Sequence, residues 1–395
     1  MPAPDRRKRV LFHVQHLLGV GHLQRSLRIA EALVDTGIAV TLVQGGPPVP
    51  EVARPPGIDL VQLPPIRARD ATFALVDEAG NPVDDELRTA RCEALLAAFA
   101  AVRPGAVVIE GFPFARRAFH FELDPLIAAA RDAGLPVICS VRDIPTVRPD
   151  PARLAEIVTR VRRDFAAVLV HGDRDFIPFD AAFPAAPEIA ERLRYTGYVV
   201  MPQPTEAAAP TGEILVSVGG GAAGRLLLEA ALAARRGGCL ADRPWRILAG
   251  ASLTAAEFAA VQQGALPGVV IERFRRDFAA LLQGSHVSVS QAGYNTVLDI
   301  VNAGVRSVLV PFAAERETEQ AIRAQHLAAR GAAIVVPERG LTPASLAAAI
   351  ERAASGEPAR ILLATGGAAR SAALIAERLI KCGASETSLR RDPAV

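Results

Sequence analysis

The stretch Ser290-Gln-Ala-Gly293-Tyr-Asn295-Thr296-Val-Leu-Asp299, followed by Pro311-Phe-Ala-Ala-Glu-Arg-Glu-Thr-Glu319-Gln320, decides the fold of the C-terminal half. It predicts a strand, a glycine turn, a helix, a second strand and a polar loop. A glycine turn that opens a helix presents backbone N–H groups and the positive end of the helix dipole, which suits a phosphate. Asp299 lies a helical turn further on, within reach of ribose hydroxyls, and Glu319 and Gln320 can reach a sugar. The stretch predicts a pocket for a sugar nucleotide.

The same alternation of short apolar strands, glycine turns and helices runs through the rest of the chain. Such alternation is typical of parallel, doubly wound α/β sheets. Residues 64–90 are polar and predict an irregular segment. The helices expected from apolar periodicity cover residues 23–34, 123–133, 318–329 and 367–380. The expected strands are 10–15, 38–43, 107–110, 137–141, 168–171, 214–218, 246–248, 269–272, 286–290, 307–310 and 333–336.

A chain of 395 residues is too long for one ordinary core, so two domains are expected. Residues 201–212 are rich in proline and alanine and lack periodicity, which indicates a linker. We therefore expect an N-terminal Rossmann-like domain over 1–200, a C-terminal one over 213–365, and a helix with a polar tail over 366–395. The two domains are expected to face a central cleft, because open α/β sheets bind ligands at the carboxyl ends of their strands.

Composition narrows the class of protein. The net charge of +2 argues against a nucleic-acid binder, which would carry a concentrated basic excess. The four cysteines are widely separated and form no CxxC pair, so we expect reduced thiols in a cytoplasmic protein. No apolar run approaches the ~20 residues that span a bilayer, and the basic N-terminus lacks the features of a signal peptide. The cluster at residues 6–9 leaves peripheral contact with the inner face of the membrane open.

Further groups at predicted strand ends fit a nucleotide-sugar donor. The triple glycine Gly219-Gly220-Gly221 follows a strand that ends near Ser217, and its amides can hold a diphosphate. Phe274 and the backbone of Arg275 can contact a base, although core packing explains Phe274 about as well. The residues assigned to the donor are Gly19, Gly21, Ser217, Gly219, Gly220, Gly221, Phe274, Arg275, Ser290, Gly293, Asn295, Thr296, Asp299, Glu319 and Gln320.

Candidate catalytic residues follow the strands of the N-terminal half. The glycine loop Gly19-Val-Gly21-His22 places a histidine at the start of a helix, where a neutral imidazole can take a proton from an attacking hydroxyl. Glu110 and Asp143 are alternative bases, because each follows an apolar strand. Arg116 and Arg142 are candidates for binding the acceptor or a phosphate. An ordinary salt-bridge network explains these four charged residues equally well.

These motifs resemble the MurG-type glycosyltransferases of glycosyltransferase family 28. Ser290-x-x-Gly293-x-x-Thr296-x-x-Asp299 is similar to that family's donor signature, in which Glu usually stands at the position of Asp299. Glu319-Gln320 stands where the family has a pair that touches the donor sugar, and Gly21-His22 resembles its N-terminal glycine loop. The N-terminal half, with Phe112-Pro-Phe-Ala-Arg-Arg, looks more like a group of uncharacterised predicted glycosyltransferases.

The resemblance implies a GT-B type enzyme that moves a sugar from a nucleotide-diphosphate donor, UDP-linked, to a hydroxyl acceptor. It implies inversion at the anomeric carbon, no metal and no other cofactor. The acceptor is left open between a lipid-linked molecule and a small metabolite. Two alternatives stay open. Gly-x-Gly-His-x-x-Arg is similar to hydrolases of UDP-linked amino sugars, which favours a UDP-sugar hydrolase or epimerase. A sugar-nucleotide-binding protein without catalysis is the second.

Overall fold

The computed structural model describes most of the chain and divides it into two compact units. Unit 1 comprises Met1–Met201 together with Leu363–Val395, and unit 2 comprises Pro202–Leu362. The residues described are 8–17, 20–50, 52–69, 73–145, 147, 150–200, 209–218, 224–250, 253–275, 277–312, 318–358 and 360–389, with side chains up to residue 380. Gly19, the triple glycine 219–221 and most of the expected linker lie outside these residues.

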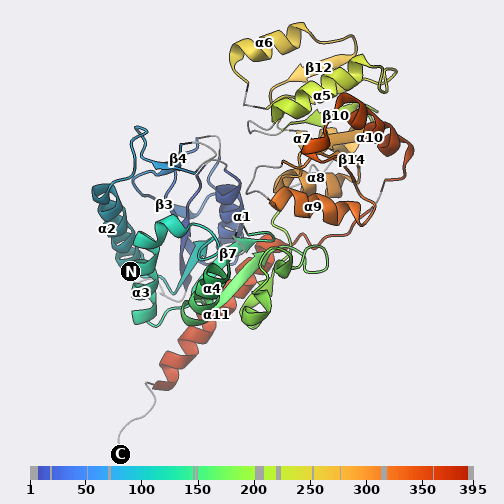
Figure 1. Ribbon diagram of the computed structural model, residues 1–395. Coiled ribbons are helices and arrows are strands. Elements are labelled where there is room, and N and C mark those ends of the chain that lie inside the picture. The colour runs from blue at the N-terminus through green and yellow to red at the C-terminus, as the bar shows by residue number, and fades with distance from the viewer. Residues whose placement is uncertain are drawn as a thin grey trace, which may run out of the picture. The chain divides into compact units, whose positions relative to one another are not determined.

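Unit 1 is built on a parallel sheet of seven strands in the order β3-β2-β1-β6-β7-β8-β9 (Figure 1). Its strands are buried on both faces and therefore appear in the sequence as continuous apolar runs. They are β1 (Arg9–Val14), β2 (Ala39–Gln44), β3 (Ile58–Gln62), β6 (Ala106–Glu110), β7 (Val137–Arg142), β8 (Ala167–His171) and β9 (Leu193–Tyr195). A short antiparallel pair, β4 (Arg67–Ala68) and β5 (Leu75–Val76), lies outside this sheet.

Helices cover both faces of this sheet. One face packs against α2 (Asp85–Val102), α3 (His120–Asp132) and α4 (Pro151–Asp164). The other packs against α1 (Gly21–Asp35) and α11 (Gly367–Leu389). Single 3-10 turns lie at Arg117–Phe119, Phe179–Ala181 and Ala186–Ile189.

Unit 2 repeats the architecture with six parallel strands in the order β12-β11-β10-β13-β14-β15. The strands are β10 (Ile214–Ser217), β11 (Trp245–Leu248), β12 (Val269–Glu272), β13 (Val287–Ser290), β14 (Arg306–Leu309) and β15 (Ile334–Val335). The helices are α5 (Gly224–Arg236), α6 (Ala255–Gln263), α7 (Phe278–Gly284), α8 (Tyr294–Ala303), α9 (Glu319–Ala328) and α10 (Pro343–Ser355), with a 3-10 turn at Glu338–Gly340.

The order of strands reverses direction once in each sheet, which creates a topological switch point. In unit 1 the switch lies between β1 and β6, and in unit 2 it lies between β10 and β13. Connections leave the two strands of a switch point in opposite directions, so a crevice opens at their carboxyl ends, where α/β proteins bind ligands. The helix α1, whose first turn carries His22, follows β1, and the turn at Gly293 follows β13. Both sequence-predicted motifs therefore lie at switch points.

The expected fold class, two doubly wound Rossmann-like domains, is confirmed, with two differences in detail. The segment 64–90 was expected to be irregular, but its last residues form the first turn of α2. The Asp84 side chain caps that helix by accepting a hydrogen bond of 2.8 Å from the Leu87 N–H. The alanine-rich helix α2 lacks the clear apolar stripe that marks a helix in sequence. The helix α4 and the edge strand β3 also had no counterpart among the expected elements.

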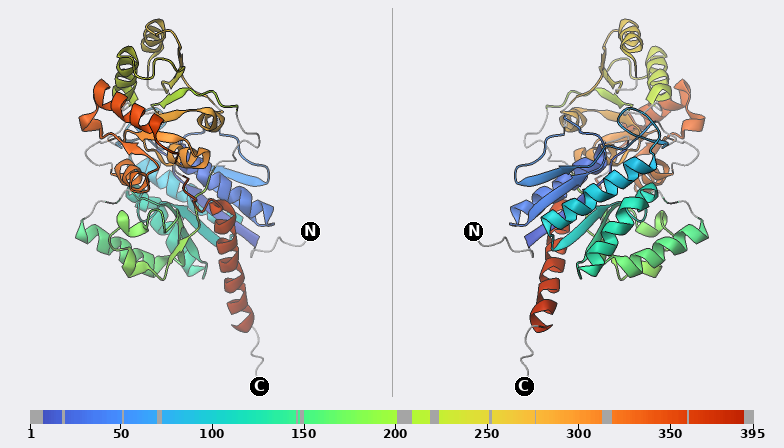
Figure 2. Two further views of the ribbon diagram at one scale, coloured as in Figure 1. Left: turned by 90° about the vertical axis from the view of Figure 1, so that its right-hand side faces the viewer. Right: turned by 90° about the vertical axis from the view of Figure 1, so that its left-hand side faces the viewer.

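The C-terminal helix belongs to the core of unit 1 rather than standing apart. In Figure 2, α11 (red) lies beside α1 (blue), and it buries four apolar side chains in the cluster beneath α1. These are Ala372, Leu374, Ile375 and Leu379. Among the described residues, none of the helices is both long and apolar enough to cross a membrane.

We predict that Ile375→Ala destabilises unit 1, because the Ile375 side chain is fully buried. Large-to-small changes of this kind cost about 2–5 kcal/mol. Unfolding by urea, followed by far-ultraviolet circular dichroism, measures the loss. The single tryptophan, Trp245, lies in β11 and reports unit 2 by its fluorescence. The matched control is Ile380→Ala on the same helix, where the side chain is 72% exposed. Equal stability of the two variants would contradict the packing role of α11.

Candidate active site

The helix α1 brings His22 to the carboxyl end of β1. Its apolar stripe, which includes Leu23, Leu27 and Leu33, is buried against the sheet. This packing fixes the rotation of the helix and places His22 and Arg25 in its first turn, at the switch point of unit 1. The His22 side chain is 22% exposed. It is therefore enclosed by protein while part of it still meets solvent.

Glu110 is the last residue of β6, the strand beside β1, and it is almost completely buried. One of its carboxylate oxygens, Oε1, lies 2.7 Å from His22 Nδ1 and 2.7 Å from Arg25 Nη2. The two nitrogens themselves lie 3.2 Å apart. We call His22, Glu110 and Arg25 the base cluster. Its members come from positions 22, 25 and 110, so only the fold brings them together.

The electrostatics of the base cluster keep its carboxylate charged and its imidazole neutral. Burial alone would raise the pKa of Glu110, but His22, Arg25 and Arg116 together hold that pKa well below its ordinary value. Burial lowers the pKa of His22 to about 4, and Arg116 and Arg25 act in the same direction against Glu110. At neutral pH the His22 ring carries one proton, on Nδ1, and this N–H donates a hydrogen bond to the Glu110 carboxylate. Nε2 then holds a lone pair and forms no hydrogen bond with any described residue.

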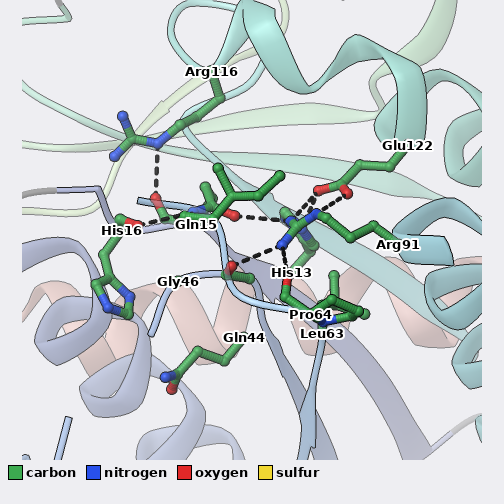
Figure 3. A network of polar contacts seen from close by, with 12 residues as sticks. His13, Gln15, His16, Gln44, Gly46, Leu63, Pro64, Arg91, Arg116 and Glu122 are labelled. Atoms are coloured by element: carbon green, nitrogen blue, oxygen red, sulfur yellow. Dashed lines mark hydrogen bonds and ion pairs between the residues drawn. The ribbon is translucent and has the colours of Figure 1, made fainter. Parts of the chain in front are cut away.

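Positive charge surrounds this cluster. Arg116 has a left-handed backbone, with φ of 62°, and its Nε donates a hydrogen bond of 2.8 Å to the carbonyl of Gln15 (Figure 3). Burial lowers the pKa of Arg116, and the charges of Arg142 and Arg25 lower it further against the attraction of Glu110. The predicted acceptor-side residues Arg116 and Arg142 thus lie close enough to influence each other, and Arg116 also acts on the base cluster.

Asp143, the third candidate base, occupies a different environment. It is fully buried directly after β7, and its carboxylate accepts hydrogen bonds of 3.0 Å from the Tyr198 hydroxyl and 2.9 Å from the Ile144 N–H. Among the described residues, Glu110 and not Asp143 contacts His22. The geometry therefore favours Glu110 as the partner of the imidazole and ties Asp143 to Tyr198.

A buried arginine that the sequence did not single out fixes the loops beside the base cluster. Arg91, from α2, forms two hydrogen bonds of 2.7 Å with the carboxylate of Glu122 (Figure 3). It also donates to the carbonyls of Gly45 and Pro64, and at 3.0 Å to the side chain of Gln15. These partners follow β2, β3 and β1. A Cβ atom at Gly45 would lie 2.1 Å from the Gln15 side chain, so this packing requires glycine there.

We predict that Arg91→Met destabilises unit 1 by about 3–5 kcal/mol, the usual cost of removing one partner of a buried ion pair. Glu122 would be left buried with a charge that only the more distant His13 side chain, 3.5 Å away, can offset. Urea unfolding of the full-length protein measures the effect. Arg88→Met on the same helix is the control, because Arg88 is 48% exposed and pairs only with exposed Asp85. Surface pairs of this kind contribute at most about 1 kcal/mol. A loss of stability that small in Arg91→Met would contradict the role assigned to the buried Arg91–Glu122 pair.

The buried histidine His171 connects neighbouring strand ends. His171 Nε2 lies 2.7 Å from Ser140 Oγ, and Nδ1 lies 3.0 Å from Thr196 Oγ1. Burial lowers the pKa of His171 to about 3, with Arg25 acting in the same direction. A neutral ring accepts from one hydroxyl and donates to the other. These two hydrogen bonds link β7, β8 and the segment after β9. They were not expected from the sequence.

In unit 2 the turn after β13 opens a helix without a side-chain cap. Gly293 is the N-cap of α8 and has no side chain that could cap the helix. Among the described residues, the nearest atom that a Cβ at Gly293 would meet is the Thr296 hydroxyl oxygen, at 3.8 Å. Ser290 is fully buried, and its Oγ has no hydrogen-bond partner among the described residues. The Ser290 hydroxyl and the glycine N-cap thus precede one helix N-terminus, a position that suits an anion.

The pair Glu319–Gln320 holds this turn in place. The side-chain oxygen of Gln320 accepts hydrogen bonds of 3.1 Å from the N–H groups of both Ala292 and Phe312. Glu319 is buried and forms an ion pair of 3.0 Å with Arg323, which in turn donates to the carbonyl of Ala292. Side chains of α9 therefore hydrogen-bond to both the N–H and the carbonyl of Ala292, the residue before Gly293. The oxygen of Gln320 is occupied by these two amides, which leaves its NH₂ group as the donor for a ligand.

The remaining donor residues are placed as follows. Ser217 ends β10 and is paired in register with Ser290, across the switch point of unit 2. Asn295 is exposed in the first turn of α8, and Asp299 lies one turn later. Phe274 is 74% exposed, so the alternative that it packs in the core is wrong. The side chain of Arg275 is held by Glu272 and Asp277. In the described part of the chain, no three His, Cys, Asp or Glu side chains are placed to share a metal ion.

Comparison with known proteins defines the class. Residues 215–379 match the model of the glycosyltransferase family 28 C-terminal domain. A relative from Phenylobacterium zucineum, named UDP-N-acetylglucosamine--N-acetylmuramyl-(pentapeptide) pyrophosphoryl-undecaprenol N-acetylglucosamine transferase, is 29% identical, over 91% of this chain and 93% of its own. A protein of the same name from Methylobacterium radiotolerans is 38% identical over 29% of this chain and 31% of its own.

Solved structures share the fold across almost the whole chain. The calicheamicin glycosyltransferase CalG4 has a TM-score of 0.59 at 20% identity, and the alignment covers 98% of this chain and 100% of that one. MurG of Acinetobacter baumannii has a TM-score of 0.56 at 18% identity, covering 94% and 99%. The chain is thus a glycosyltransferase with two Rossmann-like domains of the GT-B type. The expected resemblance to MurG-type enzymes and to family 28 is confirmed.

Proposed function

We propose that this glycosyltransferase moves a sugar from a UDP-linked donor to a hydroxyl group of an acceptor, with inversion at the anomeric carbon. The observation that carries the proposal is the base cluster. A neutral histidine is held by a buried carboxylate through Nδ1, at 2.7 Å, and keeps Nε2 as a proton acceptor at the switch point of unit 1.

The donor is assigned to unit 2. The N–H groups and dipole of α8, together with the Ser290 hydroxyl, would hold the diphosphate. Asp299 would bind the ribose, and the NH₂ group of Gln320 would bind the sugar. The uncapped start of α8 and the absence of any clash at Gly293 support this assignment. The names of the relatives, which specify a UDP-linked sugar, support the choice of UDP.

The chemistry is assigned to His22. Its Nε2 would take the proton of the acceptor hydroxyl while that oxygen attacks the anomeric carbon and the bond to the nucleotide diphosphate breaks on the opposite side. A single displacement of this kind inverts the configuration. Glu110 would stabilise the imidazolium that forms. The negative charge that develops on the diphosphate would be met by the amides and dipole of α8, so the proposed reaction uses no metal and no other cofactor.

The acceptor remains the broadest part of the proposal. We assign its binding to unit 1, where Arg116 acts on the base cluster with its positive charge and Arg142 lies near Arg116. The relatives are named for a pyrophosphoryl-undecaprenol acceptor, which supports a lipid-linked molecule, whereas the divergent N-terminal half leaves a small metabolite open. We place the reaction in the cytoplasm, with peripheral contact at the inner face of the membrane in the lipid-linked case.

Hydrolysis of the donor is the second candidate. The motif Gly19-x-Gly21-His22-x-x-Arg25 is similar to that of hydrolases of UDP-linked amino sugars, and Arg25 contacts the carboxylate that holds His22. In that reaction water takes the place of the acceptor hydroxyl. Incubation of the donor with the protein alone separates the candidates, because only the hydrolase releases free sugar and UDP without an added acceptor.

We predict that UDP and UDP-sugars bind saturably and that Asp299→Ala and Gln320→Ala each weaken binding at least about tenfold. A lost hydrogen bond to a buried partner is worth roughly 1–3 kcal/mol. Isothermal titration with UDP, UDP-glucose and UDP-N-acetylglucosamine measures the change. Gln325→Ala, on the opposite end of α9, is the control, because its side chain is exposed. Binding that is absent, or untouched by either substitution, would argue against the donor site.

We predict that His22→Ala keeps donor binding but lowers turnover by about 10²–10⁴-fold, the usual contribution of a general base. Turnover is measured as release of UDP in the presence of an acceptor panel and without it. The wild-type rate should stay constant from neutral pH down toward the pKa of His22, about 4, and fall below it as the imidazole takes up a proton. Unchanged turnover in His22→Ala would transfer the role of base to Glu110 or Asp143.

A further inference from the structure

Two donors converge on one oxygen of Glu110, and the second of them has no role yet in the proposed reaction. Arg25 Nη2 lies 2.7 Å from Oε1, the same oxygen that His22 Nδ1 contacts. Arg25 is itself buried, one helical turn after His22 on α1. The second oxygen of Glu110, Oε2, is buried and has no hydrogen-bond partner among the described residues. The charge of this carboxylate is therefore stabilised almost entirely at one atom.

The position of a single proton decides whether His22 can act as a base. If Glu110 is ionised, it accepts from Nδ1–H and leaves the lone pair on Nε2. If Glu110 is protonated, it donates to Nδ1, and the proton of the ring moves to Nε2. The ring then has no acceptor for a substrate proton. Burial favours the protonated carboxyl. A neighbouring cation that stays charged at every accessible pH opposes it, and a guanidinium meets that need.

We propose that Arg25 is a positioning residue that keeps Glu110 ionised and thereby holds His22 in the tautomer with a free Nε2. This inference rests on the proposed function, because it assigns a role in the same reaction. Arg25 touches neither the donor nor the acceptor in it. Its action passes through Glu110 to His22.

The other charged groups around the cluster do not replace Arg25. Arg116, from the segment after β6, acts on both Glu110 and His22 through space, and its own Nε is directed to Gln15. Arg142, at the end of β7, influences Arg116. His171, at the end of β8, is neutral because burial lowers its pKa to about 3. Of the cations in the described part of the chain, Arg25 is the one that hydrogen-bonds to Glu110.

The sign of the effect follows from these contacts. Arg25 lowers the pKa of both His22 and Glu110, so its removal raises the affinity of the pair for its next proton. That proton goes either to the imidazole, which becomes a cation, or to the carboxyl, which reverses the tautomer. Both outcomes remove the lone pair of Nε2, so the variant loses its active base at a higher pH than the wild type does. Loss of Arg25 therefore reduces the fraction of active base.

The test uses the full-length protein with ¹⁵N-labelled histidine and requires no substrate. Long-range ¹H–¹⁵N spectra at pH 4–9 report the tautomer and charge of His22, assigned by comparison with His22→Ala. In the wild type we expect the Nδ1–H tautomer throughout neutral pH. In Arg25→Gln we expect the titration of His22 to move up by at least about one pH unit, or the Nε2–H tautomer to replace it. Arg25→Lys keeps the charge but displaces it from the position of the guanidinium, so we expect a smaller shift of the titration in the same direction.

The control is Arg28→Gln, one turn further along α1, where the side chain is partly exposed and pairs with Glu31. It is expected to leave the titration of His22 unchanged. A folded Arg25→Gln variant whose His22 keeps its wild-type tautomer and titration would overturn the proposal. If Arg25→Gln does not fold, Arg25→Lys is the deciding variant. Its ammonium is displaced from the position of the guanidinium, so it should still shift the titration of His22 measurably.

Turnover separates this inference from the proposed function. With an active wild type, the fall of kcat at acid pH is expected to begin at least about one pH unit higher in Arg25→Gln, with little change in KM for the donor, and the rate should recover as the pH rises. An altered tautomer together with an inactive wild type would reject the transferase and hydrolase while leaving the role of Arg25 intact. An active enzyme with unaltered His22 would reject the role of Arg25 alone.

Discussion

The buried carboxylate of Glu110 is the constraint on which the candidate site depends. An ionised side chain at the end of a central strand is costly unless cations and hydrogen-bond donors surround it. The chain meets this requirement with α1, which brings His22 and Arg25 to the carboxylate, and with the segment after β6, which brings Arg116 nearby. The rotation of α1, the length of β6 and the turn after it are therefore linked. A shift of any one would leave a charge buried without compensation.

The two units solve the problem of binding in different ways. Unit 1 gathers charged side chains at its switch point and supports them with the buried Arg91–Glu122 pair. In the proposed donor site, unit 2 offers backbone amides, a serine hydroxyl with no hydrogen-bond partner among the described residues, and a glutamine whose oxygen is already occupied. Charged groups suit proton transfer, whereas a fixed array of amides suits an anion that must be released after each turnover. The division of labour that we propose follows from this difference in chemistry.

Much of the fold and about half of the site were accessible from the sequence. The strands of both sheets appear as short apolar runs, because parallel strands are buried on both faces. The glycine turns before α1 and α8 mark the two switch points. The choice among His22, Glu110 and Asp143 could not be made, because it depends on which strand ends are neighbours: β6 lies beside β1, and Tyr198 reaches Asp143 from a segment 55 residues away.

Arg91 was not singled out from the sequence, and Arg25 was quoted only as part of the Gly-x-Gly-His-x-x-Arg motif. The ion pairs of both residues were missed because the partner lies 85 positions further on for Arg25 and 31 for Arg91. Phe274 shows the opposite case. An aromatic residue after an apolar strand suggests core packing, but the Phe274 side chain is largely exposed.

The return of α11 to unit 1 has a consequence for biosynthesis. Unit 2 is inserted between the seventh strand of unit 1 and its last helix, so the chain passes from one unit to the other twice. A ribosome releases all of unit 2 before it releases Ile375 and Leu379, which complete the apolar layer beneath α1. The first unit to be translated is therefore the last to be finished. Until residues 367–379 leave the ribosome, it must wait with one sheet face partly bare, and nascent chains stalled before residue 367 should be substrates for chaperones that recognise exposed apolar surface.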